Sequence, residues 1–330
     1  MLPVVPRAAV LALVLVVLAL ACASPAAAAA PGAPLIVGIA DQRAGTFHDA
    51  RLTSLIHDAR LSVPWDAMEY DWQRREIDGW MTAAEAAGLQ PLVTFGRSRT
   101  RPFSLPPVEV YRRDVVKFRH RYPDVHEYSP WNEPNLAIHP ANSDPRKIAS
   151  YYRALRRMCP NCSVLGADVV DTSSLDRWMR AYLREFPHDA RPKLWGLHNY
   201  VDVNSSSSWG TQTMRRLAPG EIWFTETGAI VRRATPTSNG AHDRRLTIKV
   251  GAARAVAATK RVFTLAATSP RITRVYIYHW KATRSGAWDS ALVAPNGDLR
   301  PSFDVFAAQA RLALGEPSPE PAVAVAGPNP

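Results

Sequence analysis

Short apolar runs alternate with amphipathic stretches along most of the chain. From residue 35 onward, runs of about six mainly apolar residues are separated by longer stretches in which apolar residues recur every three or four positions. Such short runs are typical of buried strands, and the longer stretches are typical of helices with one apolar face. The expected strands are residues 35–40, 60–64, 90–95, 125–129, 163–169, 194–200, 221–226 and 275–280. The pattern therefore predicts eight strand-then-helix units.

Helix boundaries are marked by capping residues. Gly88 follows an amphipathic stretch at 71–87, Asp144 precedes Pro145 at the start of another, and Ser174 precedes a third at 175–186. An Asp or Ser before the first turn, a Pro within it and a Gly after the last turn are the usual signals of helix ends. Two further helices are expected at 244–267 and 303–314.

Repeated strand-then-helix units predict an α/β fold with parallel strands, because each return to the same sheet edge needs a crossover helix. Eight units in a chain of this length favour a single (β/α)8 TIM barrel, which usually takes about 250 residues. A doubly wound open sheet is the alternative, but the first expected strand ends in Gly38-Ile39-Ala40-Asp41 without a glycine-rich phosphate loop. In a barrel, the chemistry is expected where the strands end.

The two ends of the chain differ in composition from its middle. Residues 1–30 combine the cation Arg7 with an apolar run and then small residues, a pattern that predicts a secretory signal peptide. Cys22 after small and apolar residues raises the alternative of a lipid-anchored, extracytoplasmic protein. We expect the barrel at 31–315, a disordered tail rich in Pro and Ala at 316–330, and no transmembrane span in the mature chain.

The chain of 330 residues carries 40 Lys and Arg against 29 Asp and Glu, a formal net charge of +11. The basic residues are scattered through the chain and accompany no zinc-finger, RNA-binding or basic-zipper pattern, so nucleic acid is not an expected partner. For an exported protein, this charge is suited to an anionic cell-wall or envelope polymer. We expect a monomer.

Cys159 and Cys162 form a Cys-Pro-Asn-Cys turn. In a reducing compartment this spacing could serve redox chemistry or half of a metal site, but there is no second such pair. Export favours a local structural disulfide. The histidines form no pair with metal-ligand spacing, and we expect neither metal nor cofactor.

Two glutamates lie at the ends of expected strands. Glu133 follows the fourth strand, and Glu226 ends the seventh. Glycoside hydrolysis uses such a pair, one carboxylic acid protonating the leaving oxygen while the other carboxylate attacks the sugar or activates water. Alone, each glutamate is better explained as an ordinary loop or strand-end carboxylate, but barrel closure would direct both into one cleft.

The residues around both glutamates resemble the retaining glycoside hydrolases of clan A, (β/α)8 enzymes that include families 39 and 5. Trp131-Asn132-Glu133-Pro134-Asn135 is similar to the clan's Asn-Glu-Pro motif, which implies Glu133 as the acid/base and Asn132 as a sugar ligand. The segment Trp223-Phe224-Thr225-Glu226-Thr227-Gly228 is similar to the setting of its nucleophile, which implies that role for Glu226.

The resemblance implies four further site residues. His198 and Tyr200 lie two apart, share one face of the expected sixth strand, and would orient the two glutamates. Trp280, at the end of the eighth strand, would stack on the sugar, and Arg60 on the second would keep Glu226 ionised. The alternatives are core packing for the aromatic residues and a surface position for Arg60.

One departure argues against membership of family 5, because Gly96-Arg97-Ser98 follows the third strand without the histidine that many of its members carry there. The resemblance implies cleavage of β-linked oligo- or polysaccharides by double displacement, with the pKa of Glu133 raised so that it can be protonated. The alternative function is a non-catalytic barrel that binds carbohydrate or cell-wall polymer.

Overall fold

The structure is a computed structural model that describes residues 34–233 and 250–316. The expected signal peptide, all of the expected tail beyond residue 316, and the start of the helix expected at 244–267 lie outside the described residues. In the part that is described, no helix is long and apolar enough to cross a membrane.

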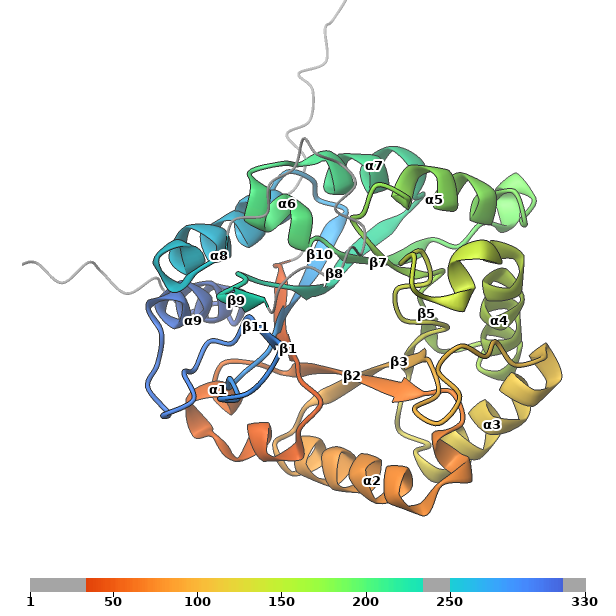
Figure 1. Ribbon diagram of the computed structural model, residues 1–330, viewed down its shortest axis with the longest axis horizontal. Coiled ribbons are helices and arrows are strands. Elements are labelled where there is room, and N and C mark those ends of the chain that lie inside the picture. The colour runs from red at the N-terminus through yellow and green to blue at the C-terminus, as the bar shows by residue number, and fades with distance from the viewer. Residues whose placement is uncertain (1–33, 234–249, 317–330) are drawn as a thin grey trace, which may run out of the picture. The chain divides into compact units, whose positions relative to one another are not determined.

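Nine parallel strands form the central sheet, and helices surround it (Figure 1). The order across the sheet is β5-β4-β3-β2-β1-β10-β8-β7-β6. The strands are β1 (Ile36–Ala40), β2 (Asp58–Pro64), β3 (Gln90–Gly96), β4 (Glu127–Ser129), β5 (Ser163–Val164), β6 (Asp168–Val170), β7 (Leu194–His198), β8 (Glu221–Thr227) and β10 (Ile272–Tyr278). This chain order confirms the α/β class and the parallel sheet, and the fold is TIM-barrel-like.

The two outer strands of this order, β5 and β6, belong to one short chain segment. The sequence predicts a single strand at 163–169, whereas residues 165–167 interrupt it. On one side of the interruption the Leu165 amide donates to the Tyr128 carbonyl of β4, at 2.9 Å, and on the other the Gly166 amide donates to the Leu194 carbonyl of β7, at 2.7 Å. The segment thus joins both ends of the sheet, and hydrogen bonding divides it into two strands instead of the one expected.

The helices follow the strands in sequence. They are α1 (Ala50–Thr53), α2 (Asp71–Ala86), α3 (Val108–Arg121), α4 (Pro145–Met158), α5 (Leu175–Leu183), α6 (Tyr200–Ser205), α7 (Trp209–Leu217), α8 (Ala252–Ala266) and α9 (Pro301–Ala313), with 3-10 turns at Ala44–His48, Ala67–Glu69, Pro140–Ser143 and His188–Ala190. The expected cap is confirmed, because the Asp144 carboxylate accepts a bond of 2.8 Å from the Lys147 amide. After α4, Cys159 and Cys162 are disulfide-bonded.

A second, two-stranded sheet lies among the loops that follow β8 and β10. It pairs β9 (Arg232–Arg233) with β11 (Trp288–Asp289) in antiparallel fashion. Neither strand was expected, because two residues are too few to show an alternating pattern. The pairing places Trp288, from the loop after β10, beside the loop that follows Glu226.

Buried charges gather where β2, β4, β8 and β10 begin. Arg274 Nη1 donates to Asp58 at 3.0 Å and to Glu127 at 2.8 Å, and its guanidinium lies 3.9 Å from the centre of the Trp223 ring. Burial raises the pKa of both carboxyl groups, although Arg274 acts in the opposite direction. In TIM barrels this end of the strands serves stability, whereas the opposite end carries the chemistry.

Candidate active site

Glu133 lies beyond β4 with an unusual backbone conformation. Its φ of 46° is in the left-handed region, which costs free energy for a residue other than glycine. Two backbone bonds hold it there: the Glu133 amide donates to the Asp168 carbonyl at 2.8 Å, and the Asn132 amide donates to Phe95 at 2.7 Å. The chain is thereby fixed between its neighbours β3 and β6 when it delivers the glutamate.

His198, at the end of β7, contacts both glutamates. Its Nδ1 lies 2.9 Å from Glu133 Oε1 and 3.9 Å from Glu226 Oε2. Because both oxygens are close to the same atom, they lie within about 7 Å of each other, a limit that admits the ~5–5.5 Å carboxyl spacing of retaining glycosidases. The structure thus brings together the two glutamates, which are distant in sequence.

Arg60 is completely buried and reaches the site from β2. Its Nη1 donates to Glu226 Oε2 at 2.8 Å, and its Nη2 donates to Asn132 Oδ1 at 2.6 Å. On the other oxygen of Glu226, the Tyr200 hydroxyl donates at 3.1 Å. Tyr200 does not end a strand as expected, since it is the first residue of α6, yet its hydroxyl still reaches the nucleophile candidate.

Asp168, on β6, is a site residue that was not predicted. Its side chain has no solvent exposure. One carboxylate oxygen accepts from Arg60 at 2.7 Å and from the Thr94 hydroxyl at 3.1 Å. The other lies 3.1 Å from His198 Nε2 and accepts a short bond from the Thr225 hydroxyl. The sequence did carry a signal, because an aspartate within an apolar strand needs buried partners.

These contacts control the ionisation of the site. Burial alone would lower the pKa of His198, but the carboxylates of Asp168 and Glu226 raise it to about 10. Burial would raise the pKa of Glu133, but the hydrogen bond and charge of His198, together with the charge of Arg60, hold it below its usual value. The expected raised pKa of Glu133 is therefore wrong for the unliganded site, in which an imidazolium faces a carboxylate.

His139 is a second residue near Glu133 that was not predicted. The residue is 7% exposed, and its Nδ1 has no hydrogen-bond partner among the described residues. Burial lowers its pKa to about 4, in spite of the nearby Glu133, so the ring is neutral at physiological pH. His139 therefore adds no positive charge beside Glu133 at that pH.

Trp280 does not occupy the position expected for sugar stacking. Its side chain is buried, its ring packs edge-on against Phe303 of α9 at 5.8 Å, and its Nε1 donates to Asp49 at 3.0 Å. The strand ends at Tyr278, and the Trp280 amide donates to Asp41. The residue therefore no longer follows the strand alternation that would have pointed it into the cleft, and the prediction is wrong.

Trp288 is an aromatic residue that packs beside the site. Its half-buried ring meets the Tyr200 ring edge-on, with ring centres 5.0 Å apart. The Arg233 guanidinium lies 5.8 Å from the centre of the Trp288 ring. Because Tyr200 bonds directly to Glu226, Trp288 is one residue removed from the nucleophile candidate.

Comparison with known proteins agrees with this arrangement. Residues 130–306, which begin just before Glu133 and include Glu226, match the family described as glycosyl hydrolase catalytic core. The chain belongs to this family. The match covers more than half of the chain and confirms the expected resemblance to glycoside hydrolases. No curated protein sequence matches the chain.

Solved structures of glycoside hydrolases share the fold of this glycosyl hydrolase core. A family 39 glycoside hydrolase from Bacteroides cellulosilyticus WH2 has a TM-score of 0.58 at 16% identity, over 85% of this chain and 64% of its own. A GH5_18 protein from Streptomyces cattleya in complex with GlcNAc has a TM-score of 0.60 at 13% identity, over 88% of this chain and 83% of its own. Xylanase 10B from Thermotoga petrophila RKU-1 has a TM-score of 0.60 at 11% identity, over 84% of this chain and 94% of its own. The chain thus spans less than two thirds of the first of these structures.

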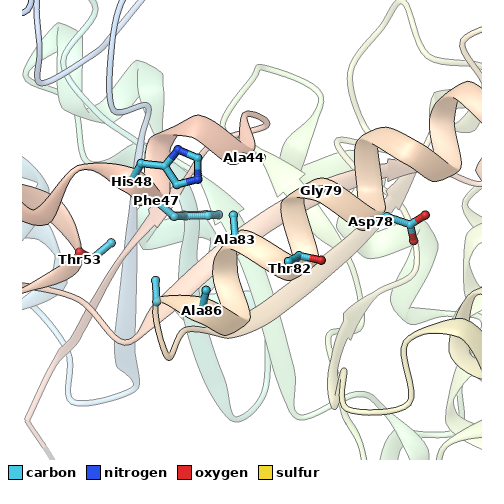
Figure 2. Close-up of a pocket in the computed structure, with 10 residues that line it drawn as sticks. Ala44, Phe47, His48, Thr53, Asp78, Gly79, Thr82, Ala83 and Ala86 are labelled. Atoms are coloured by element: carbon cyan, nitrogen blue, oxygen red, sulfur yellow. The ribbon is translucent and has the colours of Figure 1, made fainter.

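The structure also has a surface groove away from this site, formed by residues that precede the family match. Figure 2 shows it along the outer side of α2, between that helix and residues 44–53, with His48 and Asp78 at its margins. Small residues of α2, among them Gly79 and Ala83, line it.

Among the described residues, no group of three or more His, Cys, Asp and Glu side chains could hold a metal ion.

Proposed function

We propose that this chain is a retaining glycoside hydrolase with a single (β/α)8 barrel in which β5 and β6 are two parts of the fifth strand. The bonds it cleaves are O-glycosidic bonds of β-linked oligo- or polysaccharides. The observation that carries the proposal is the contact of one His198 nitrogen with both Glu133 and Glu226, at 2.9 and 3.9 Å. A binding module would have no need of two carboxylates held in this way.

In the first step, a Glu226 oxygen attacks the anomeric carbon while the bond from that carbon to the leaving oxygen breaks. Arg60 and Tyr200 direct hydrogens at the two oxygens of Glu226, which fixes the orientation of its carboxylate. Glu133 gives its proton to the leaving oxygen, so the departing sugar leaves as a neutral alcohol.

The proton that Glu133 delivers comes from its pair with His198. In the unliganded site this proton is on the imidazole, and transfer along the 2.9 Å contact from Nδ1 to Oε1 creates the acid form of Glu133. In the second step, Glu133 takes a proton from water, the water oxygen attacks the anomeric carbon, and the bond to Glu226 breaks. The sugar is released with its original configuration, and no cofactor takes part.

Two site residues support substrate binding. The Asn132 amide oxygen is fixed by Arg60, which leaves the amide NH2 as the group suited to a sugar hydroxyl next to the reacting carbon. Trp288 takes the stacking role expected of Trp280, because its ring is half-buried beside Tyr200. Aromatic faces suit the apolar C–H surface of a sugar ring.

Glu133→Gln and Glu226→Gln, assayed on aryl β-glycosides and a panel of β-glycans, test the proposal. Loss of the acid/base should lower turnover by about 10²–10⁴-fold, and loss of the nucleophile by at least as much. Glu221→Gln is the matched control, because Glu221 is on the same strand as Glu226 but at its opposite end, bonded to Trp223 at 2.7 Å.

Comparable activity of the two variants and the control would contradict the catalytic assignment. The anomer released first, followed by NMR, tests the retaining mechanism separately: inversion would refute it. Undiminished glycan binding by a wild type that cleaves nothing would favour the carbohydrate- or polymer-binding alternative instead.

The proposed place of action is extracytoplasmic, with a lipid anchor at Cys22 as the alternative to a cleaved secretory leader. The bonded pair Cys159 and Cys162 supports this, because structural disulfides persist in oxidising compartments. The net charge of +11 supports contact with an anionic wall or envelope polymer.

A further inference from the structure

We propose that Asp168 is a positioning residue that holds His198 and Arg60 against the two glutamates and fixes the proton shared by His198 and Glu133. The effect of Asp168 on catalysis rests on the proposed function. The protonation of the His198 ring can be tested without any substrate.

Asp168 lies between the two cationic groups of the site. Arg60 Nη2 and His198 Nε2 are only 3.2 Å apart, a separation at which two positive charges in a buried site repel strongly. Asp168 accepts from Arg60 with one oxygen, at 2.7 Å, and faces His198 with the other, at 3.1 Å. Its negative charge is therefore what allows both cations to remain together.

The Asp168 carboxylate is itself held from two further strands. Thr94 on β3 and Thr225 on β8 each donate a hydroxyl to it, so both oxygens have two partners. Gly196, its register partner on β7, leaves the space it occupies: a Cβ there would overlap Asp168 Oδ1. The surroundings thus keep this side chain in one orientation.

A line of contacts runs from Asp168 through His198 to Glu133. Carboxylates lie on both sides of the imidazole, at 3.1 Å from Nε2 and 2.9 Å from Nδ1, so both nitrogens donate and the ring is an imidazolium. The charged groups that face this ring are Asp168 from β6, Glu133 from the loop after β4, Glu226 from β8 and Arg60 from β2. Glu133 in turn is near His198, His139 and Arg60.

The sign of the effect on pH dependence follows from these charges. The His198–Glu133 pair holds one exchangeable proton, and the enzyme loses its general acid when that proton leaves. The Asp168 charge binds this proton more tightly, because it favours the imidazolium. Removing the charge should release the proton at lower pH and move the basic limb of the activity profile downward.

Asp168→Asn keeps the size of the side chain but removes its charge, and it is the deciding variant. In wild type, NMR of the labelled imidazole should show both His198 nitrogens protonated at pH 7.5. In the variant, the His198 titration and the basic limb of kcat/KM should both fall by about one pH unit or more. The variant should also lower kcat more than it raises KM, because ground-state sugar contacts remain.

Asp58→Asn is the matched control, since Asp58 is also a buried aspartate paired with an arginine on a barrel strand, but at the other end. It should lower stability and leave both titrations in place. A neutral His198 at pH 7.5 in wild type would overturn the proposal even if the Asp168 variant failed to fold. A folded Asp168→Asn variant in which neither the His198 titration nor the basic limb of kcat/KM shifts would overturn the proposal too. An inactive wild type with a protonated His198 would refute the proposed function alone.

Discussion

Removal of Arg274 provides a direct test of how the barrel's opposite end is stabilised. Arg274→Met keeps a long apolar side chain but removes the guanidinium that lies over Trp223, and it leaves Asp58 and Glu127 without the cation that both contact, at 3.0 and 2.8 Å. Breaking a buried ion pair from one side costs about 3–5 kcal/mol. Because all three side chains retain 11–17% exposure, we expect about 3 kcal/mol, the lower end of that range, at pH 7.

The cost should depend on pH in a defined direction. Burial raises the pKa of both carboxyl groups in the folded protein, so they bind protons more tightly than in the unfolded chain. Their contribution to stability is therefore greatest at low pH and decreases as the pH rises through their raised pKa values. Without Arg274 the pKa values rise further, which makes the deficit of the variant large at pH 7 and smaller near pH 4.

Urea denaturation of wild type and variant at both pH values measures this deficit. Arg216→Met is the matched control, because Arg216 also pairs with an aspartate, Asp176, but their side chains are 55% and 31% exposed. Such a surface pair contributes about 0–1 kcal/mol. The stabilising role of Arg274 is refuted if Arg274→Met lowers the free energy of unfolding no more than the control does at pH 7. Equal losses at both pH values would refute it as well.

Two further substitutions test the site. Trp288→Ala should raise KM by about two- to tenfold, the equivalent of an aromatic contact of about 0.5–1.5 kcal/mol, whereas Trp280→Phe should affect stability and leave KM unchanged; steady-state kinetics that show the reverse would restore Trp280 as the stacking residue. Gly196→Ala should destabilise the protein by about 1–3 kcal/mol, because the new methyl group would overlap Asp168; an unchanged melting temperature would contradict this.

The alternation of apolar runs and helical stretches was sufficient to predict the strands, because each parallel strand is buried on both faces and its composition shows this directly. It could not show where hydrogen bonding stops within a run. Residues 165–167 are as apolar as their neighbours, yet they turn from β4 toward β7, and the predicted strand becomes β5 and β6. Which partner a segment pairs with depends on closure of the whole sheet.

Asp168 shows a different limit of the sequence. An aspartate between Ala167 and Val169 indicates only that a buried carboxylate needs partners, and it does not identify them. Its partners come from β2, β3, β7 and β8, which are distant in the chain and meet only through the register of the sheet. Positions at strand ends therefore indicated the two glutamates, while the carboxylate that holds their neighbours His198 and Arg60 required the three-dimensional structure.

The contrast between Glu133 and Trp280 explains why one residue beyond a strand was placed correctly and the other was not. Alternation fixes the direction of a side chain only while the ladder of hydrogen bonds continues. Beyond β4 the ladder continues locally, because Asn132 bonds to Phe95 and Glu133 to Asp168, so Glu133 still points with the strand ends into the site. Beyond β10 the Trp280 amide bonds instead to the side chain of Asp41. The Trp280 ring packs on Phe303 of α9, and an aromatic contact with the site comes instead from Trp288, later in the same loop.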